Sequence, residues 1–442
     1  MKEFLTKLIE KFLLKYKSLP IVFFFLATVC VPFVPKAEDD NFIQLKLVIM
    51  ICISVYVIYF SLCVSNNRLP HAKRGTCAVL FVVDAETEAL FNDIKNKLIS
   101  NFDEYINYNS RFSFSPVYIR KNDIPNYSLI NKDSMLQLLT KTGTMFVVDV
   151  KYRVDDVTRA EKFEIGFNFG VIHPTFADSI TSVLKHDMLL LQKRVRKKRF
   201  ERSQLLEQFD VTAQQLSLIC KYIVGFVMLL SQQPQAAYEL LREVYLLAKE
   251  MRSSVDDPLL KLVELRLVSA CLINAELDVD SFSQTKDLHF LDHMDQMVEE
   301  ANFLRPGLPQ YYTCKAYYAI AKNRDAKAAT EYVSKAKCID SSKSWRYSDA
   351  FIAAFTGKSP LTIYKKYMYA FKVEYNLIQI VDFIEYIISE EPERTGLFLA
   401  AGLVYDEMGD KGLSNSYFKK YLDTNTNSTI QDLLEEKMAQ SA

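Results

Sequence analysis

The sequence is poor in glycine and proline, with 11 and 13 residues among 442. Because both concentrate in turns, so few of them argue against an all-β protein and against long disordered linkers. Lysine plus arginine and aspartate plus glutamate each number 54, which leaves no net charge. A neutral chain does not coat nucleic acid over its whole surface, although a local basic patch remains compatible with it. The length predicts two or three domains.

Residues that commonly carry chemistry are also scarce. The chain has five histidines and eight cysteines, and no CxxC pair marks a zinc or redox site. We expect free thiols, because the charge pattern near the start of the chain predicts a cytoplasmic location, which is a reducing compartment. His289 and His293 are four residues apart, a spacing that fits a metal, but no third ligand accompanies them. We therefore predict a chain that is not an enzyme and that holds neither a cofactor nor a metal.

Two long uncharged stretches stand near the start of the chain, at residues 19–35 and 47–67. A transmembrane helix needs about 20 apolar residues, so residues 19–68 predict a two-transmembrane hairpin. Lysines precede the first stretch, and Arg68, Lys73 and Arg74 follow the second, whereas the loop between them is mainly acidic. Positive residues stay on the cytoplasmic side. The pattern predicts a multi-pass protein of the bacterial inner membrane with both termini in the cytoplasm.

The membrane segments have few polar features. Residues 1–18 predict an amphipathic basic helix that lies on membrane lipid, because apolar side chains recur at helical spacing among lysines. The two spans contain no ionisable residue, so no proton relay or ion site is indicated. They would line an aqueous path only in a homo-oligomer, and a simple anchor is the alternative. The small residues best suited to close helix packing are Ala27, Thr28, Ser54 and Ser61.

Residues 76–175 predict a small α/β domain. Apolar runs and alternating segments indicate strands at residues 76–84, 114–119, 144–154 and 161–172, with helices at 86–105 and 134–140. The first turn, DAETEA, is acidic and lacks glycine, which does not suit a nucleotide phosphate. The order β-α-β-α-β-β resembles, in topology, the amino-terminal domain of TolB-type proteins.

Residues 176–210 predict a connecting helix with a dense basic cluster. Seven positive charges fall within ten positions, and Glu201 is the only acid among them. We expect this cluster to bind a polyanion, either anionic lipid headgroups or a nucleic acid, unless it is only a solvated helix face. Its members are Lys193, Arg194, Arg196, Lys197, Lys198, Arg199 and Arg202.

Residues 211–430 predict successive helix pairs. The clearest, residues 397–423, has Gly402, a Gly409–Asp410 turn and Phe418 in the order small residue, turn, aromatic. Residues 313–340 fit with one departure, since Tyr317 stands where the pattern has glycine; residues 224–245 and 359–392 fit more loosely. These segments resemble tetratricopeptide repeats. The resemblance implies a curved, all-α solenoid whose concave face binds a segment of a protein partner.

The predicted fold is thus a membrane α-hairpin, a small α/β domain and an all-α solenoid of tetratricopeptide type. In architecture it resembles the two-transmembrane effectors of bacterial anti-phage systems, in which a retron or a nucleotide signal controls a membrane-damaging protein. That resemblance implies an effector held inactive by a protein or nucleoprotein partner and disrupting the inner membrane by oligomerising when released. The alternative is a passive scaffold that recruits a protein complex to the inner membrane.

Overall fold

The computed structural model describes residues 69–439, except 86, 109, 125–131, 145, 156–161, 172–182, 184–185, 188–189, 192–197, 202–204, 252–256 and 426–429. The predicted amphipathic helix and both predicted spans, within residues 1–68, lie outside the described residues.

The first described unit is an open sheet of five strands in the order β2-β1-β3-β4-β5. β1 runs parallel to β2 and β3, whereas β4 is antiparallel to both β3 and β5. The predicted α/β order is confirmed as far as the β3–β4 hairpin. The strands are β1 (Cys77–Ala85), β2 (Phe114–Arg120), β3 (Phe146–Asp155), β4 (Lys162–Val171) and β5 (Lys198–Glu201).

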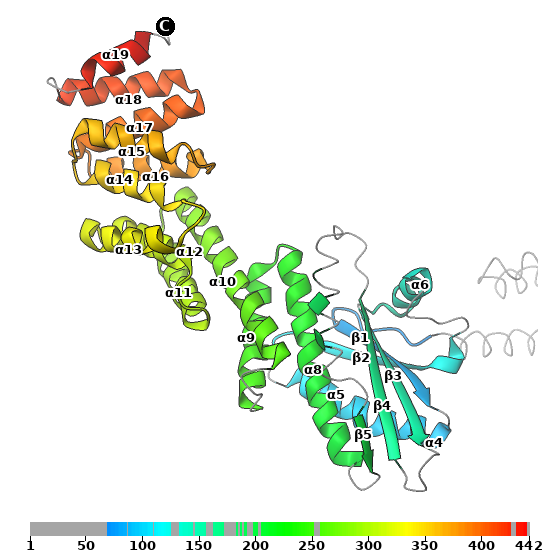
Figure 1. Cartoon of the computed structure of the whole chain (residues 1–442). Coiled ribbons are helices and arrows are strands. Elements are labelled where there is room, and N and C mark those ends of the chain that lie inside the picture. The colour runs from blue at the N-terminus through cyan, green and yellow to red at the C-terminus, as the bar shows by residue number, and fades with distance from the viewer. Residues whose placement is uncertain are drawn as a thin grey trace, which may run out of the picture.

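Helices cover both faces of this sheet (Figure 1). Alternate residues of β1 point to opposite sides, so Phe81 packs on one face with Phe102, and Leu80 packs on the other with Leu138. The first face carries the continuous helix formed by α4 (Glu88–Asp93), the π-helical segment η2 (Ile94–Ile99) and α5 (Ser100–Asn107). The second face carries α6 (Lys132–Thr142), which follows the short 3₁₀ turn η3 (Lys121–Asp123).

The strand β5 corrects the prediction of one connecting helix over residues 176–210. Residues 198–201 pair with the outer edge of β4, with Phe200 opposite Phe163 and Arg199 opposite Glu164. Long-range pairing therefore outweighs the local helical preference of this basic segment. The sheet unit consequently extends beyond the predicted boundary at residue 175.

The helix α8 (Leu205–Leu230) joins the sheet unit to the repeats. Its stretch Phe209–Leu230 is the one described helix that is long and apolar enough to span a membrane, and 72% of it is buried inside the protein. Leu216, Ile219 and Ile223 pack in the same cluster as Phe102 of α5. The apolar character of α8 is therefore explained by core packing, because one face covers the sheet unit and another packs on α9.

The remaining chain forms a helical solenoid, as predicted. Helix pairs are α8–α9, α10–α11, α12–α13, α14–α15 and α17–α18. Many of these helices begin with an aspartate cap, which accepts hydrogen bonds from amides of the first turn, or with proline, which has no amide to satisfy there. The further helices are α9 (Pro234–Glu250), α10 (Pro258–Thr285), α11 (Leu288–Leu304), α12 (Pro309–Ala321), α13 (Ala326–Ile339), α14 (Trp345–Phe355), α15 (Pro360–Ala370), α16 (Leu377–Glu390), α17 (Thr395–Met408), α18 (Lys411–Thr424) and α19 (Gln431–Ala439).

The pair α17–α18 shows how the repeat pattern produces close packing. A Cβ atom on Gly402 would lie 2.5 Å from the ring of Phe418, so only glycine lets the two helices approach this closely. Gly409 ends α17 with φ of +81°, and the Asp410 side chain accepts a hydrogen bond from the amide of Leu413 at the start of α18. The predicted pairs at residues 224–245, 313–340 and 397–423 are all present.

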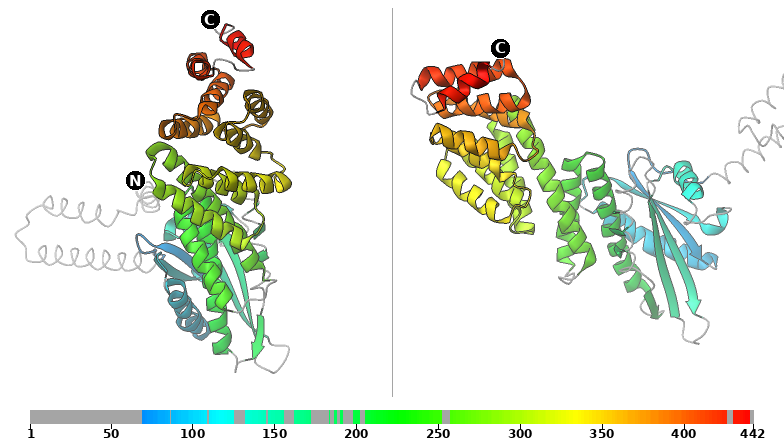
Figure 2. Two further views of the ribbon diagram at one scale, coloured as in Figure 1. Left: turned by 90° about the vertical axis from the view of Figure 1, so that its left-hand side faces the viewer. Right: turned by 45° about the horizontal axis from the view of Figure 1, so that its top comes forward.

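The fourth predicted pair, at residues 359–392, is not present as a pair. In the structure α15 packs on α14 and α17, and α16 packs chiefly on α17 rather than on α15. The described chain is elongated as a result of the stacking: the sheet lies at one end and α19, with the C-terminus, at the other (Figure 2).

Candidate functional site on the helical repeats

The site residues predicted from sequence fall mostly outside the described residues. This holds for the membrane-packing candidates Ala27, Thr28, Ser54 and Ser61, and for five of the seven basic-cluster residues. The exceptions are Lys198 and Arg199, which belong to β5 at the edge of the sheet. Polyanion binding by the basic cluster therefore stays a prediction.

The helix α16 lies across the first helices of several pairs. Its Phe383 ring stands 4.4 Å from Tyr317 of α12 and 4.9 Å from Phe351 of α14, measured between centroids. Its Tyr386 ring meets Phe282 of α10 edge-on at 5.1 Å. Farther along the solenoid, Glu385 accepts hydrogen bonds from tyrosines of α17 and α18. One helix thus contacts four successive helix pairs, and we call α16 the brace.

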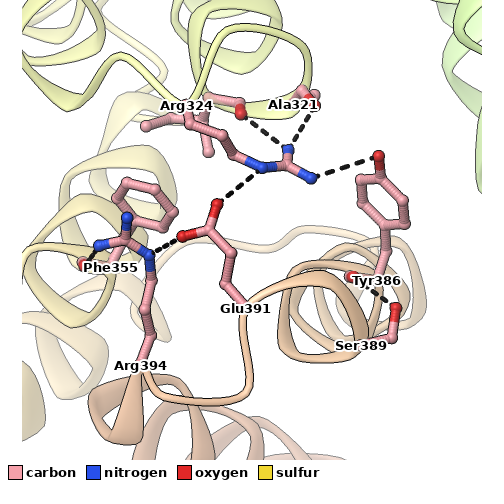
Figure 3. A network of polar contacts seen from close by, with 8 residues as sticks. Ala321, Arg324, Phe355, Tyr386, Ser389, Glu391 and Arg394 are labelled. Carbon is pink, nitrogen blue, oxygen red and sulfur yellow. Dashed lines mark hydrogen bonds and ion pairs between the residues drawn. The ribbon is translucent and has the colours of Figure 1, made fainter.

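A polar network fixes the end of this brace (Figure 3). Glu391 accepts from the Arg324 guanidinium at 2.9 Å and also pairs with Arg394. Arg324 donates to carbonyls at the end of α12, and Arg394 donates to the Phe355 carbonyl at 2.8 Å at the end of α14. Each positive charge thus lies at the negative end of a helix dipole. A single carboxylate ties three helix ends together.

Beside the brace lies a group of acids and tyrosines, the acidic–aromatic surface. Glu276 and Asp280 are one turn apart on α10, and Tyr375 projects from the loop before α16 with 48% of it exposed. The ring of Tyr347, on α14, lies 5.2 Å from that of Tyr375. The fifth member, Tyr317, approaches from α12.

The two carboxylates of this surface, Glu276 and Asp280, interact electrostatically. Burial, and then the charge of Asp280, raise the pKa of Glu276 above its ordinary value. Asp280 accepts a hydrogen bond from the Gln379 amide of α16. Among the described residues, no lysine, arginine or histidine pairs with either carboxylate. The surface therefore concentrates negative charge that the described part of the protein leaves uncompensated.

The hydroxyl oxygen of Tyr317 is buried. Burial raises its pKa strongly, and a hydrogen bond with the Ser283 side chain opposes the shift. Tyr375 is close enough to raise the pKa of this hydroxyl further.

The junction between sheet unit and repeats is also polar and tightly packed. The Lys221 ammonium on α8 is fully buried and pairs with Glu243 of α9 at 2.5 Å; burial lowers its pKa, and Glu243 opposes that shift. Asp187 accepts from the hydroxyl of Tyr222 at 2.7 Å and from Arg266 of α10 at 2.8 Å. These buried contacts join α8, α9 and α10 to one another and to Asp187, which lies between β4 and β5 in the sequence.

The residues that follow the predicted second span are packed against the sheet unit. The amide of Ala72 donates to the Thr142 carbonyl at 2.8 Å, and the His71 ring occupies the space beside Gly143, where a Cβ would lie 2.5 Å from it. Leu69 and Ala72 join the apolar cluster that contains Leu138 of α6. The chain leaves the predicted membrane segment directly into the core of the α/β domain.

His293 has a role other than the metal binding that its spacing from His289 suggested. His293 forms a hydrogen bond of 2.7 Å with Asp278 of α10, so it links α11 to α10. In the described part of the chain, no group of three or more histidine, cysteine, aspartate or glutamate side chains is arranged to hold a metal ion.

The chain matches no protein-family model, and no curated protein matches it with significance. The candidate site therefore rests on its geometry. Sequence reasoning missed the acidic–aromatic surface and the α16 brace, although one sign of both was present. Tyr317 departs from the repeat pattern where glycine is usual, and in the structure this bulky ring contacts Phe383 of the brace.

Proposed function

We propose that this chain is a membrane-tethered effector of a bacterial antiviral defence system. In this proposal its repeats, of tetratricopeptide type, bind a protein or nucleoprotein partner that holds it inactive. Release lets the predicted spans oligomerise and disrupt the inner membrane. The basic cluster at residues 193–202 would add contacts to the partner's nucleic acid or to lipid headgroups.

One observation supports an effector over a passive scaffold. Packed contacts run without a gap from the repeats through α8 to the sheet, and from α6 to Ala72. A passive anchor needs no such connection, because a flexible linker would tether the repeats equally well. A protein that transmits partner binding to its membrane segments needs a stiff connection between the two, since coupling travels through contiguous packed elements.

The test inserts a flexible glycine–serine segment between Arg68 and Leu69. We expect the variant to stay in the membrane and to keep its partner, because the repeats are unchanged. It should depolarise cells even when its partner is co-expressed, since the restraint that the partner places on the repeats no longer reaches the spans. A truncated chain that starts at Gly75 should be harmless. Membrane potential is measured with a voltage-sensitive dye.

The control is the same insertion between Pro306 and Gly307, in the exposed turn between α11 and α12. The co-expressed partner should still silence this variant. If the partner also silences the variant with the insertion after Arg68, rigid transmission is wrong. If the full chain never changes the membrane potential, with or without its partner, the scaffold function replaces the effector function.

A further inference from the structure

We propose that the sheet unit rests on the headgroup layer of the inner membrane through its amino edge, the edge at which β1, β2 and β3 begin, and that this edge binds anionic phospholipid. The inference rests on the proposed function in one respect, namely that residues 47–67 span the membrane. It adds a second membrane contact, which is made by described residues and is separate from the basic cluster. Such a contact would fix the direction in which the repeats extend from the membrane.

The amino edge is defined by the register of the strands. Cys77, the first residue of β1, lies opposite Phe114, the first residue of β2, and Phe146 at the start of β3 lies opposite Val79. The helix α6 ends at the same edge, because its last residue, Thr142, comes shortly before β3. Because β1 has nine residues, the carboxyl edge of the sheet lies about 26 Å from the amino edge.

The chain itself holds the amino edge close to the membrane. Leu69 packs in the apolar cluster under α6, and the Ala72 amide donates to the Thr142 carbonyl at 2.8 Å. Ala72 comes five residues after the end of the predicted span, and this length of chain reaches at most about 18 Å. The headgroup layer takes up about 5–8 Å of that reach. The amino edge therefore begins within about 13 Å of the headgroups.

The charges at this edge suit an anionic lipid surface. Lys73 and Arg74 lie in the turn before β1, and Lys141 lies in the last turn of α6, beside the residue that Ala72 contacts. All three side chains are exposed, and in the described part of the chain none of them forms an ion pair. Each lysine or arginine near an anionic membrane surface strengthens the contact about fivefold.

A tyrosine adds an interfacial side chain to the same edge. Tyr108 is 59% exposed and follows Asn107, whose side chain bonds to both the amide and the carbonyl of Phe114 at the start of β2. Tyrosine is enriched at membrane interfaces because its ring is apolar and its hydroxyl is polar. The carboxyl edge differs in charge, since Lys121, directly after β2, is paired with Asp84 of β1 at 2.6 Å.

The experiment measures energy transfer from the sheet unit to the membrane surface, with the full chain reconstituted in vesicles. The donor is a genetically encoded fluorescent amino acid, and the acceptor is rhodamine attached to lipid headgroups. The donor replaces either Thr140 near the amino edge or Asn122 at the carboxyl edge, both of which are exposed. The vesicles contain phosphatidylcholine alone or with about 30% phosphatidylglycerol, which is anionic.

We expect transfer from position 140 to exceed transfer from position 122, to be stronger in the anionic vesicles than in the neutral ones, and to fall at high salt. The variant Lys73→Gln/Lys141→Gln keeps Arg68 and Arg74, so its topology should not change. Its contact with the anionic surface should weaken about 30-fold, because two charges are lost at about fivefold each. Transfer from position 140 should then fall to its value in neutral vesicles.

The matched control is Lys327→Gln/Lys419→Gln, which removes two exposed lysines of the repeats and should behave like the native chain. Circular dichroism checks that each variant is folded. Equal transfer from position 140 in neutral and anionic vesicles would overturn the inference, because the tether alone would then explain the proximity. An equal loss in both double variants would also overturn it, because overall charge would then be responsible.

Carbonate extraction of the same vesicles tests the membrane tether separately. A chain that carbonate releases has no membrane span, which would refute the tether and this contact together. A chain that resists carbonate but shows no dependence on anionic lipid would refute the contact alone, and the proposed function would stand.

Discussion

Buried tyrosine hydroxyls are a feature of the repeats at the scale of single residues. Tyr367 of α15 is fully buried, and its hydroxyl has no hydrogen-bond partner among the described residues. Burial alone raises the pKa of this hydroxyl far above its ordinary value. The folded protein therefore holds this proton at a pH where the unfolded chain releases it, so stability is complete below pH ~10 and falls above it.

We predict that Tyr367→Phe stabilises the protein at neutral pH by about 1 kcal/mol, because it removes an unsatisfied buried hydroxyl. Above pH ~10 the variant should lose stability less steeply than the native chain, by up to about 1.4 kcal/mol per pH unit. Urea unfolding measured across that pH range checks both expectations. Tyr364→Phe, one turn earlier and only partly buried, should change neither. An unchanged slope in Tyr367→Phe would show that this hydroxyl is not shielded from solvent.

Residues whose partners lie nearby in the chain could be predicted from the sequence. Gly402 and Phe418 belong to one repeat, and the spacing of a small and an aromatic residue was enough to place them together. Tyr317 and Glu391 could not be placed in this way, because their partners come from helices distant in the chain. Tyr317 appeared only as a departure from the pattern, without an indication of what it contacts.

At the scale of elements, α16 is the part that the repeat pattern misassigned. The sequence pairs it with α15, but its apolar face instead meets α12 and α14. The reason is that α16 carries aromatic residues that pack on rings of helices already paired with others. β5 is a similar case, since its place is decided by the free edge of β4. In both cases a tertiary partner overrides the local pattern, whereas the β3–β4 hairpin, whose strands are adjacent in sequence, was predicted correctly.

We predict that Phe383→Ala releases α16 from the solenoid. The ring is 9% exposed and contacts both Tyr317 and Phe351, and removing a buried phenylalanine costs about 3–5 kcal/mol. Amide hydrogen exchange should accelerate across α16, while α8 keeps its protection because it lies in a different core cluster. The matched variant Phe303→Ala changes a side chain that is 73% exposed and should leave exchange unchanged. Uniform acceleration through the whole chain would contradict a separate brace.

At the scale of the whole molecule, the described parts form one packed series from α19 to Leu69. The repeats stack pair on pair, α8 belongs to both the sheet and the repeats, and α6 holds the residues that follow the predicted second span. Leu69 packs in the α/β domain and comes directly after the predicted second span in the sequence. The side of the membrane on which Arg74 lies therefore decides the location of every described element.

We predict that this side is the cytoplasm. Lysines precede the first predicted span and Arg68, Lys73 and Arg74 follow the second, while acids dominate the loop between the spans. Alkaline phosphatase is active only outside the cytoplasm, so a fusion within residues 37–44 should show activity and a fusion after Arg74 should show none. A cytoplasmic reporter such as β-galactosidase should give the opposite pattern. Activity of the phosphatase fused after Arg74 would place the α/β domain and the repeats outside the inner membrane. It would thereby remove the cytoplasmic partner on which the effector proposal depends.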